Sequence, residues 1–231
     1  MESLREALHA LWRPQEAFAE LGQARFRPGR AFLRMLLWWL PPALALGVLE
    51  TRSALAVYQA MRAGHLPAWF PTWALPGLDS ESAVAFFRGL PAPPGWDRIL
   101  PALLLLVPLE VVGVWLHDAV WDHTALWMLG GLKARRGFRA TMLADSEALR
   151  IASLGSWAGL LGFLPRVGSL LSAPLLLLSA YLWIFRGFSL AACHGLPAWK
   201  GLAATLLHLV LMGVFVLVLL AMMMALLGLA G

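Results

Sequence analysis

The sequence predicts an all-α, polytopic membrane protein, built as a bundle of five transmembrane helices with peripheral amphipathic helices. The first observation is the run from Ala203 to Ala230, which contains no charged residue and exceeds the roughly 20 apolar residues that cross a bilayer as a helix. The second is composition: 60% of the 231 residues are hydrophobic and 13% are charged, against roughly 45–50% and 25% in soluble domains. The third is a series of further apolar runs at helical spacing.

Residues 1–30 are predicted to form a cytoplasmic amphipathic segment. The spacing of apolar side chains from Ser3 to Leu21 is helical and one-sided, and Pro14 divides it into two pieces. Helices of this kind lie along a membrane surface or dock on other helices. Arginines interrupt every apolar stretch here, so we expect no secretory signal peptide and an N-terminus that is retained.

Residues 31–231 are predicted to form the five-span membrane domain. A kink is expected at Pro41-Pro42 within the first span, and the helix of the second span is expected to continue to Met128. The Pro- and Trp-rich segment 50–98 is interpreted as an ordered outer loop at the water–lipid boundary. Residues 138–150 are interpreted as a short amphipathic helix. The five spans are expected at 31–49, 99–116, 149–164, 169–188 and 203–230.

The basic residues predict the orientation, because they accumulate on the cytoplasmic side of helical membrane proteins. With the N-terminus cytoplasmic, most of the 18 basic residues fall in inside segments. The C-terminus is then outside. Placement of this kind sets topology, so the net charge of +5 does not indicate a nucleic-acid partner. The outer exceptions are Arg52, Arg62, Arg88, Arg98 and Arg166.

Four short motifs stand in order along the chain: Pro14-Gln15-Glu16-Ala17-Phe18, His123 followed by Gly130-Gly131 and Gly137-Phe138, the turn 163–168, and the loop 194–200. In order and spacing they resemble the opening segment, the central signature and the later inter-span segments of the Yip family, the membrane domain named for Ypt/Rab-interacting proteins.

The resemblance implies a five-span, non-enzymatic scaffold or membrane organiser that binds partner proteins. Eukaryotic members bind Rab GTPases. The Arg, Ala, Leu, Gly and Trp content of this chain indicates a GC-rich bacterial genome, and therefore the cytoplasmic (inner) membrane of a bacterium with no Rab partner. The partners that we expect are the lipid bilayer, a membrane or cytoplasmic protein, and a second copy of the chain.

Glu110 is the strongest candidate site residue. It falls near the bilayer centre in the second predicted span, where a charge costs roughly 2.5–3.5 kcal/mol. His117 lies about 20° from it on the helical wheel, and Asp118 and Asp122 share the adjacent face. One interpretation is a cytoplasmic polar path to Glu110 that carries protons or a divalent cation, as in a small transporter or a lipid- or ion-handling protein. The other is a structural Glu110, protonated or hydrogen-bonded to Thr51, Ser179, Tyr181 or His208. In that case Asp118, Asp122 and His123 mark the wet end of the helix.

Other patterns have mainly structural interpretations. Gly155 and Gly159 give a small-residue face for close helix packing, within the chain or between copies. Asp145-Ser146-Glu147 is interpreted as a helix cap. No catalytic or phosphate-binding motif is present, and the single Cys193 excludes a disulfide framework. We therefore expect no enzyme and no cofactor. Contact with lipid headgroups is expected from Lys133, Arg135, Arg136 and Arg139.

Overall fold

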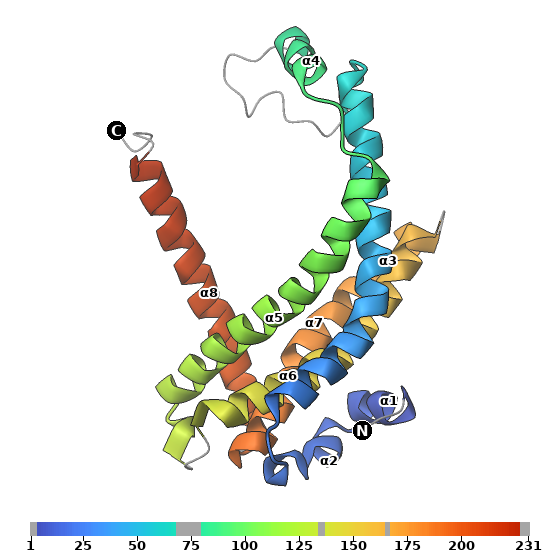
Figure 1. The fold of residues 1–231 in the computed structure, drawn as a ribbon. Coiled ribbons are helices and arrows are strands. Elements are labelled where there is room, and N and C mark those ends of the chain that lie inside the picture. The colour runs from blue at the N-terminus through green and yellow to red at the C-terminus, as the bar shows by residue number, and fades with distance from the viewer. Residues whose placement is uncertain (1–3, 68–79, 134–136, 165–166, 227–231) are drawn as a thin grey trace. The chain divides into compact units, whose positions relative to one another are not determined.

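The computed structural model describes residues 4–67, 80–133, 137–164 and 167–226, and all the regular elements in these ranges are helical (Figure 1). The predicted all-α class is confirmed. The elements are α1 (Leu4–Trp12), α2 (Pro14–Phe18), η1 (Leu21–Gln23), α3 (Pro28–Arg62), α4 (Ser80–Gly89), α5 (Trp96–Met128), η3 (Gly131–Lys133), α6 (Gly137–Gly159), η4 (Leu160–Phe163), α7 (Val167–His194) and α8 (Ala198–Leu226).

The chain folds as two compact units. Unit 1 contains Met1–Pro42 and Pro108–Gly231, and unit 2 contains Ala43–Val107. The divisions fall at prolines inside α3 and α5, where the missing backbone N–H leaves the helical hydrogen-bond ladder incomplete.

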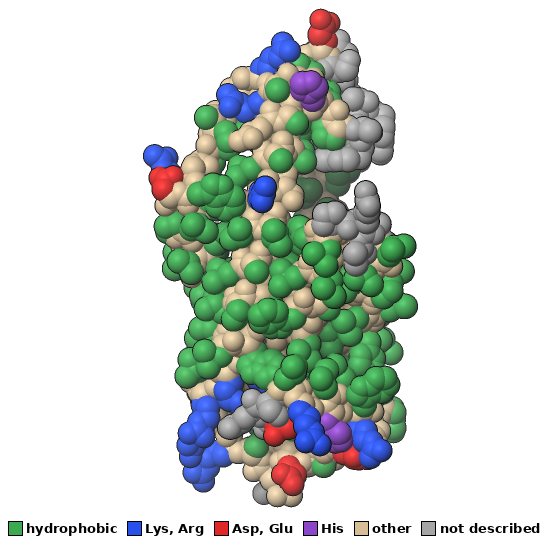
Figure 2. Space-filling view, turned by 90° about the vertical axis from the view of Figure 1, so that its right-hand side faces the viewer, with side chains coloured by type: hydrophobic (Ala, Val, Ile, Leu, Met, Phe, Trp, Pro, Cys, Tyr) green, Lys and Arg blue, Asp and Glu red, His purple; other side chains and the backbone are tan. Residues whose placement is uncertain are grey.

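Four helices are long and apolar enough to cross a membrane: α3, α5, the segment Leu170–His194 of α7, and α8. The mean hydropathy of α8 reaches 3.0, and its side chains from Val214 to Leu226 are exposed. Hydrophobic side chains also dominate the surface in the middle of Figure 2. The chain is therefore a multi-pass membrane protein by length and composition, whereas the predicted count of five spans is not confirmed.

The difference lies in α6, which merges the predicted amphipathic helix 138–150 with the predicted span 149–164. No break occurs between them, and α6 is continuous from Gly137 to Gly159. Residues 144–151 are all buried, polar and charged ones included. The prediction of a peripheral amphipathic helix was wrong because the polar face of α6 meets polar side chains of other helices rather than water.

The predicted outer loop 50–98 is also shorter than expected. Helix α3 continues to Arg62, because residues 50–62 are rich in good helix formers, and α5 begins at Trp96. Gly64, at φ 92°, ends α3 with the His65 N–H bonded to the Ala60 carbonyl at 2.9 Å. Residues 68–79 of this segment lie outside the described residues. Within unit 2 the Tyr58 hydroxyl donates to the Pro91 carbonyl at 2.7 Å, which ties α3 to the chain before α5.

In unit 1, α7 is the central helix and contacts α2, η1, α6, η4 and α8. The backbones of α7 and α8 approach closely: a Cβ at Gly187 would lie 2.7 Å from Thr205 Oγ1 and 2.8 Å from Leu202 Cα, and one at Gly201 would overlap the Gly187 carbonyl oxygen. Only glycine permits this backbone contact. A layer of small and apolar residues packs beside it: Ala125, Leu126, Ala144, Leu190, Cys193 and Ala204.

The N-terminal segment forms two short helices separated at Pro14, as its sequence pattern predicts. Their apolar side chains pack into unit 1, where the rings of Phe18 and Phe185 lie 5.2 Å apart and Ala7 and Ala10 are buried. The Tyr181 hydroxyl of α7 donates to the Leu11 carbonyl. The segment therefore docks on the bundle through both packing and a hydrogen bond.

Candidate functional site

Four helices of unit 1 place ionisable side chains against one another in the interior. We call this group the Asp–Arg–His cluster. The exposed fraction is 0% for Asp122 and Asp145, 3% for Arg186, 1% for His208 and 9% for Asp118. The members are Asp118 and Asp122 of α5, Asp145 of α6, Arg186 of α7 and His208 of α8.

The cluster forms because each member lies at a similar distance from one end of its helix. Each member lies about 9–15 Å along its helix from that end, at 1.5 Å per residue. The ends are the last residue of α5, the first of α6, the last of α7 and the first of α8. Short links join α5 to α6 and α7 to α8, so these ends come together. The cluster therefore lies at the level where the apolar run of α5 ends, after Leu116, and before the run of α6 begins, at Leu149.

Arg186 is the centre of the cluster. Its Nη1 lies 2.6 Å from Asp118 Oδ2, and its Nε lies 3.3 Å from Asp122 Oδ2, where the geometry falls short of a hydrogen bond. The guanidinium also lies over the Trp183 ring, with 4.3 Å from Cζ to the ring centroid, a cation–π arrangement. A single arginine thus binds two carboxylates of α5 to α7.

His208 extends this network to α8. Its Nδ1 lies 2.7 Å from Asp122 Oδ1 and also 2.7 Å from Arg186 Nη2. A ring nitrogen carries either a proton or a lone pair, so Nδ1 donates to Asp122 or accepts from Arg186, but not both. The two protonation forms of the ring therefore engage different partners.

Asp145 is enclosed beside Asp122, and neither of its carboxyl oxygens has a hydrogen-bond donor among the described residues. Burial raises the pKa of the Asp145 carboxyl well above its ordinary value; the charge of Asp122 raises it further, and Arg186 opposes the shift. A neutral Asp145 has an O–H that can donate to Asp122. We therefore expect a carboxylic acid here, next to the Asp122 carboxylate.

A metal is the alternative occupant that the sequence left open. His117, Asp118 and His208 could each offer one ligand atom within 4.8 Å of the others. The Arg186 guanidinium, however, already contacts both Asp118 Oδ2 and His208 Nδ1 and supplies the positive charge at that point. The donor set therefore fits an internal ion-pair network better than a divalent cation.

Glu110 does not belong to this cluster. It lies on the exposed face of α5, and it has no hydrogen bond or ion pair with any described residue. The expected partners are engaged elsewhere: Ser179 with Leu175, Tyr181 with Leu11 and His208 with Asp122. Among the described residues no polar contact joins Glu110 to a polar path or to its expected partners, and the buried polar face of α5 is the face of Asp118 and Asp122.

A second buried polar group joins three helices on the side of α6 nearer its start. Thr141 Oγ1 lies 2.9 Å from His123 Nδ1 of α5 and 3.0 Å from His194 Nε2 of α7. The hydroxyl donates once and accepts twice, so one histidine must supply a hydrogen to it and the other can accept one. His123 thus links helices rather than only marking a wet helix end.

A third group surrounds Glu147, which the sequence indicated only as a helix cap. Glu147 Oε2 lies 3.0 Å from Arg150 Nη2, and Oε1 lies 3.2 Å from Arg34 Nη1 of α3. Arg150 is 1% exposed, and its guanidinium lies over the Trp38 ring at 5.0 Å. Here α6 and α3 are held together by two arginines sharing one carboxylate.

The remaining candidate residues lie apart from these groups. A Cβ at Gly155 would lie 2.8 Å from Leu182 Cδ1 of α7, so Gly155 of the Gly155/Gly159 face packs inside the chain. Arg139 is exposed near the start of α6. Arg135 and Arg136 lie outside the described residues, and the side chain of Lys133 is not described.

Sequence reasoning missed Asp145, Arg186, Arg150 and Thr141 as members of buried groups. Arg186 carried a usable signal, because an arginine inside the apolar run 169–188 requires an acidic partner within the bundle. Asp145 and Arg150 carried none, since their local pattern is that of a solvated amphipathic helix.

The fold and these groups define the class: a polytopic α-helical membrane protein whose helices are joined by buried ion pairs. Comparisons with protein-family models, curated proteins and solved structures found no match to this chain. The resemblance to the Yip family therefore stays a prediction.

Proposed function

We propose that this protein is a non-enzymatic membrane scaffold or organiser. The observation that carries the proposal is the pairing of its buried arginine with carboxylates inside the bundle. Arg186 contacts both Asp118 and Asp122, and these contacts tie helices together instead of lining a route across the membrane. Glu110, the residue on which a transport path would depend, lies on the exposed face of α5.

The exposed apolar surface of α8 supports the same function. In its second half, after His208, most side chains are exposed, including Leu217 at 66% and Leu226 at 84%. A helix that is apolar all round belongs in lipid or against another apolar helix. The partners that we propose are therefore the bilayer and a membrane protein, with a second copy of the chain as one candidate.

The proposed topology keeps five crossings, a cytoplasmic N-terminus and the inner membrane of a bacterium as a Yip-like protein. Support for the fifth crossing comes from α6 and η4, which both pack against α7. Because only a few residues connect the end of η4 to the start of α7, α6 and α7 run antiparallel. The polar part of α6 is enclosed by protein, and the exposed residues 161–164 are mostly apolar. Reporter fusions at the two termini test this count: opposite sides of the membrane support five crossings, and the same side overturns it.

A second candidate function, ion or proton handling, is favoured by the charge count of the cluster. Three carboxyl groups face one arginine, so a proton or a cation must balance the excess. The site of such a function is the Asp–Arg–His cluster rather than Glu110.

One experiment separates the two candidates. The purified protein is reconstituted into liposomes that contain a pH-sensitive dye, and a pH gradient or a membrane potential is imposed. The scaffold proposal predicts that liposomes with the protein show the same flux as liposomes without it. A flux that Asp145→Asn abolishes in a folded protein would instead move ion handling to first place.

A further inference from the structure

A basic cavity lies at the end of unit 1 where the N-terminal segment meets α3 and α6. We call it the arginine cavity; its volume is about 500 Å³. It is distinct from the Asp–Arg–His cluster and from the basic group 133–139. Its lining combines charged and apolar side chains: Ala17, Phe18, Glu20, Leu21, Ala24, Arg25, Arg27, Arg30, Ala31, Arg34, Leu143 and Glu147.

The cavity has a net positive charge, because four arginines and two glutamates line it. Arg25, Arg27 and Arg30 are exposed and form no ion pair with a described residue. Of the two acids, Glu147 is already shared by Arg34 and Arg150. Guanidinium groups bind phosphate oxygens through paired N–H donors, so the available chemistry is that of a phosphate site.

The backbone at the start of α3 adds to the positive potential of the cavity. Helix α3 begins at Pro28, which has no N–H, and the Ala31 N–H donates to the Arg27 carbonyl. The first-turn N–H groups without an intrahelical acceptor are therefore those of Gly29 and Arg30. Together with the helix macrodipole they attract an anion. The space beside Gly29 is open, with nothing within 4 Å of a Cβ built there.

The cavity also lies next to an apolar track. Arg30, Leu33 and Leu37 follow one another at the three- and four-residue spacing of one helix face, and Leu33 and Leu37 are 54% and 65% exposed. A phosphate held at Arg30 would place attached acyl chains along these leucines. A free phosphate ion has no acyl chain that could lie along these leucines.

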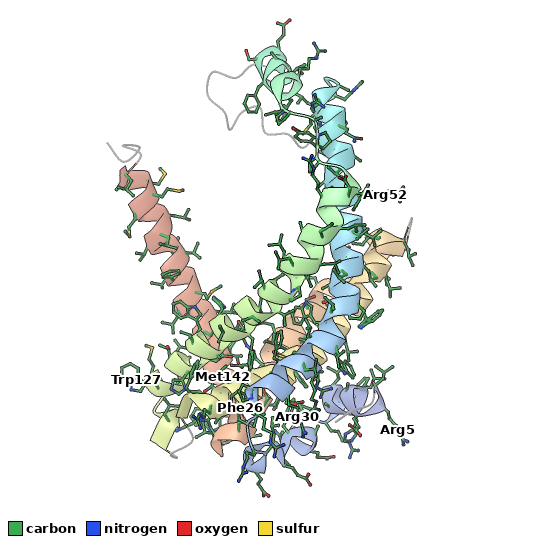
Figure 3. The ribbon with its side chains drawn as sticks, in the orientation of Figure 1. Arg5, Phe26, Arg30, Arg52, Trp127 and Met142 are labelled. Atoms are coloured by element: carbon green, nitrogen blue, oxygen red, sulfur yellow. The ribbon has the colours of Figure 1, made fainter. Side chains whose placement is uncertain are left out.

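The position of the cavity fits the water–lipid boundary. Trp127, at the end of α5, is 68% exposed and projects outward at the same end of unit 1 as Arg30 (Figure 3), and exposed tryptophans mark that boundary. Basic side chains gather at this end of the molecule in Figure 2. We propose that the arginine cavity binds the phosphate headgroup of an anionic phospholipid, with the acyl chains along Leu33 and Leu37.

The test is native mass spectrometry of the full chain in a non-ionic detergent. The protein is titrated with phosphatidylglycerol, phosphatidylcholine or glycerol 3-phosphate, and the fraction carrying one bound molecule gives an apparent Kd. The site variant is Arg25→Gln/Arg27→Gln/Arg30→Gln. The matched control is Arg5→Gln/Arg13→Gln/Arg52→Gln, which removes the same charge from exposed positions outside the cavity; Arg5 and Arg52 are labelled with Arg30 in Figure 3.

We expect one phosphatidylglycerol to bind at least about tenfold more tightly than phosphatidylcholine, and the site variant to weaken this binding about 100-fold, at about fivefold per arginine. The control should bind like the wild type. Equal binding of both lipids, an unaffected site variant, or a control as weak as the site variant would each overturn the proposal. Glycerol 3-phosphate that binds as tightly as phosphatidylglycerol would overturn the lipid assignment, since the site would then take a soluble phosphate.

Discussion

Replacing Asp122 by asparagine tests whether the Asp–Arg–His cluster holds the bundle together. The variant keeps the size of the side chain but removes the carboxylate that lies 3.3 Å from Arg186 Nε and 2.7 Å from His208 Nδ1. Breaking a buried ion pair costs about 3–5 kcal/mol, because one charge is left buried without compensation. Asp118 still neutralises Arg186 from 2.6 Å, so we expect the lower end, about 3 kcal/mol.

The assay is thermal unfolding in detergent followed by tryptophan fluorescence. For a chain of 231 residues, 1 kcal/mol shifts Tm by about 2–4 °C, so Asp122→Asn should lower Tm by about 6–12 °C. The matched control is Asp145→Asn, at a neighbouring buried carboxyl. An asparagine there retains a donor toward Asp122, as the protonated acid does, and it has no ionisation that opposes folding, so the control should not lower Tm.

Two results would refute this reasoning. An Asp122→Asn protein that unfolds at the wild-type temperature would mean that the network contributes nothing to stability. An Asp145→Asn protein as unstable as Asp122→Asn would mean that Asp145 is ionised and paired in the folded state, contrary to its enclosed position.

Three further predictions concern stability. Because the pKa of Asp145 is raised on folding, ionisation of Asp145 opposes folding. The stability of the wild type should therefore fall relative to that of Asp145→Asn as the pH rises from the ordinary carboxyl range. A difference in Tm that stays constant between about pH 4 and about pH 9 would contradict this. Gly201→Ala should cost about 1–3 kcal/mol, since its Cβ would meet the backbone of α7. Gly213→Ala has open space and should not lower Tm, because alanine is the better helix former; equal effects would disprove the close helix contact. Thr141→Val should cost about 1–3 kcal/mol because it leaves two histidines without a shared hydroxyl. The half-buried Thr124, whose hydroxyl bonds only the Val120 carbonyl of its own helix, should cost less than Thr141 when replaced by valine, and similar Tm values for the two variants would argue against that link.

The buried groups share one structural role, although each uses different chemistry. A hydrophobic driving force does not hold helices together in lipid, where the tails are as apolar as the side chains. Interhelical polar contacts and close backbone packing remain, and unit 1 has both, at Arg186 and at Gly187. This explains why polar residues are concentrated in the interior of a protein with an apolar surface.

Much of the fold could be predicted from the sequence. The run 203–230, the division of the N-terminal helices at Pro14 and the apolar runs that became α3, α5 and α7 are all local patterns. Hydropathy and helical spacing are properties of neighbouring residues, so they indicate which segments are helices and that lipid is their solvent. The shared face of Asp118 and Asp122 is equally local, since a four-residue spacing fixes it.

Only the tertiary structure decided what those faces meet. Asp118 and Asp122 find Arg186 far along the chain, and Asp145 is enclosed in a helix whose pattern indicated a solvated surface. Glu110 shows the converse: it lies on the exposed side of α5, although burial cost alone favoured a partner for it. The periodicity of a helix separates its polar face from its apolar face. Whether water, lipid or another helix covers each face depends on how the helices pack, which no local pattern contains.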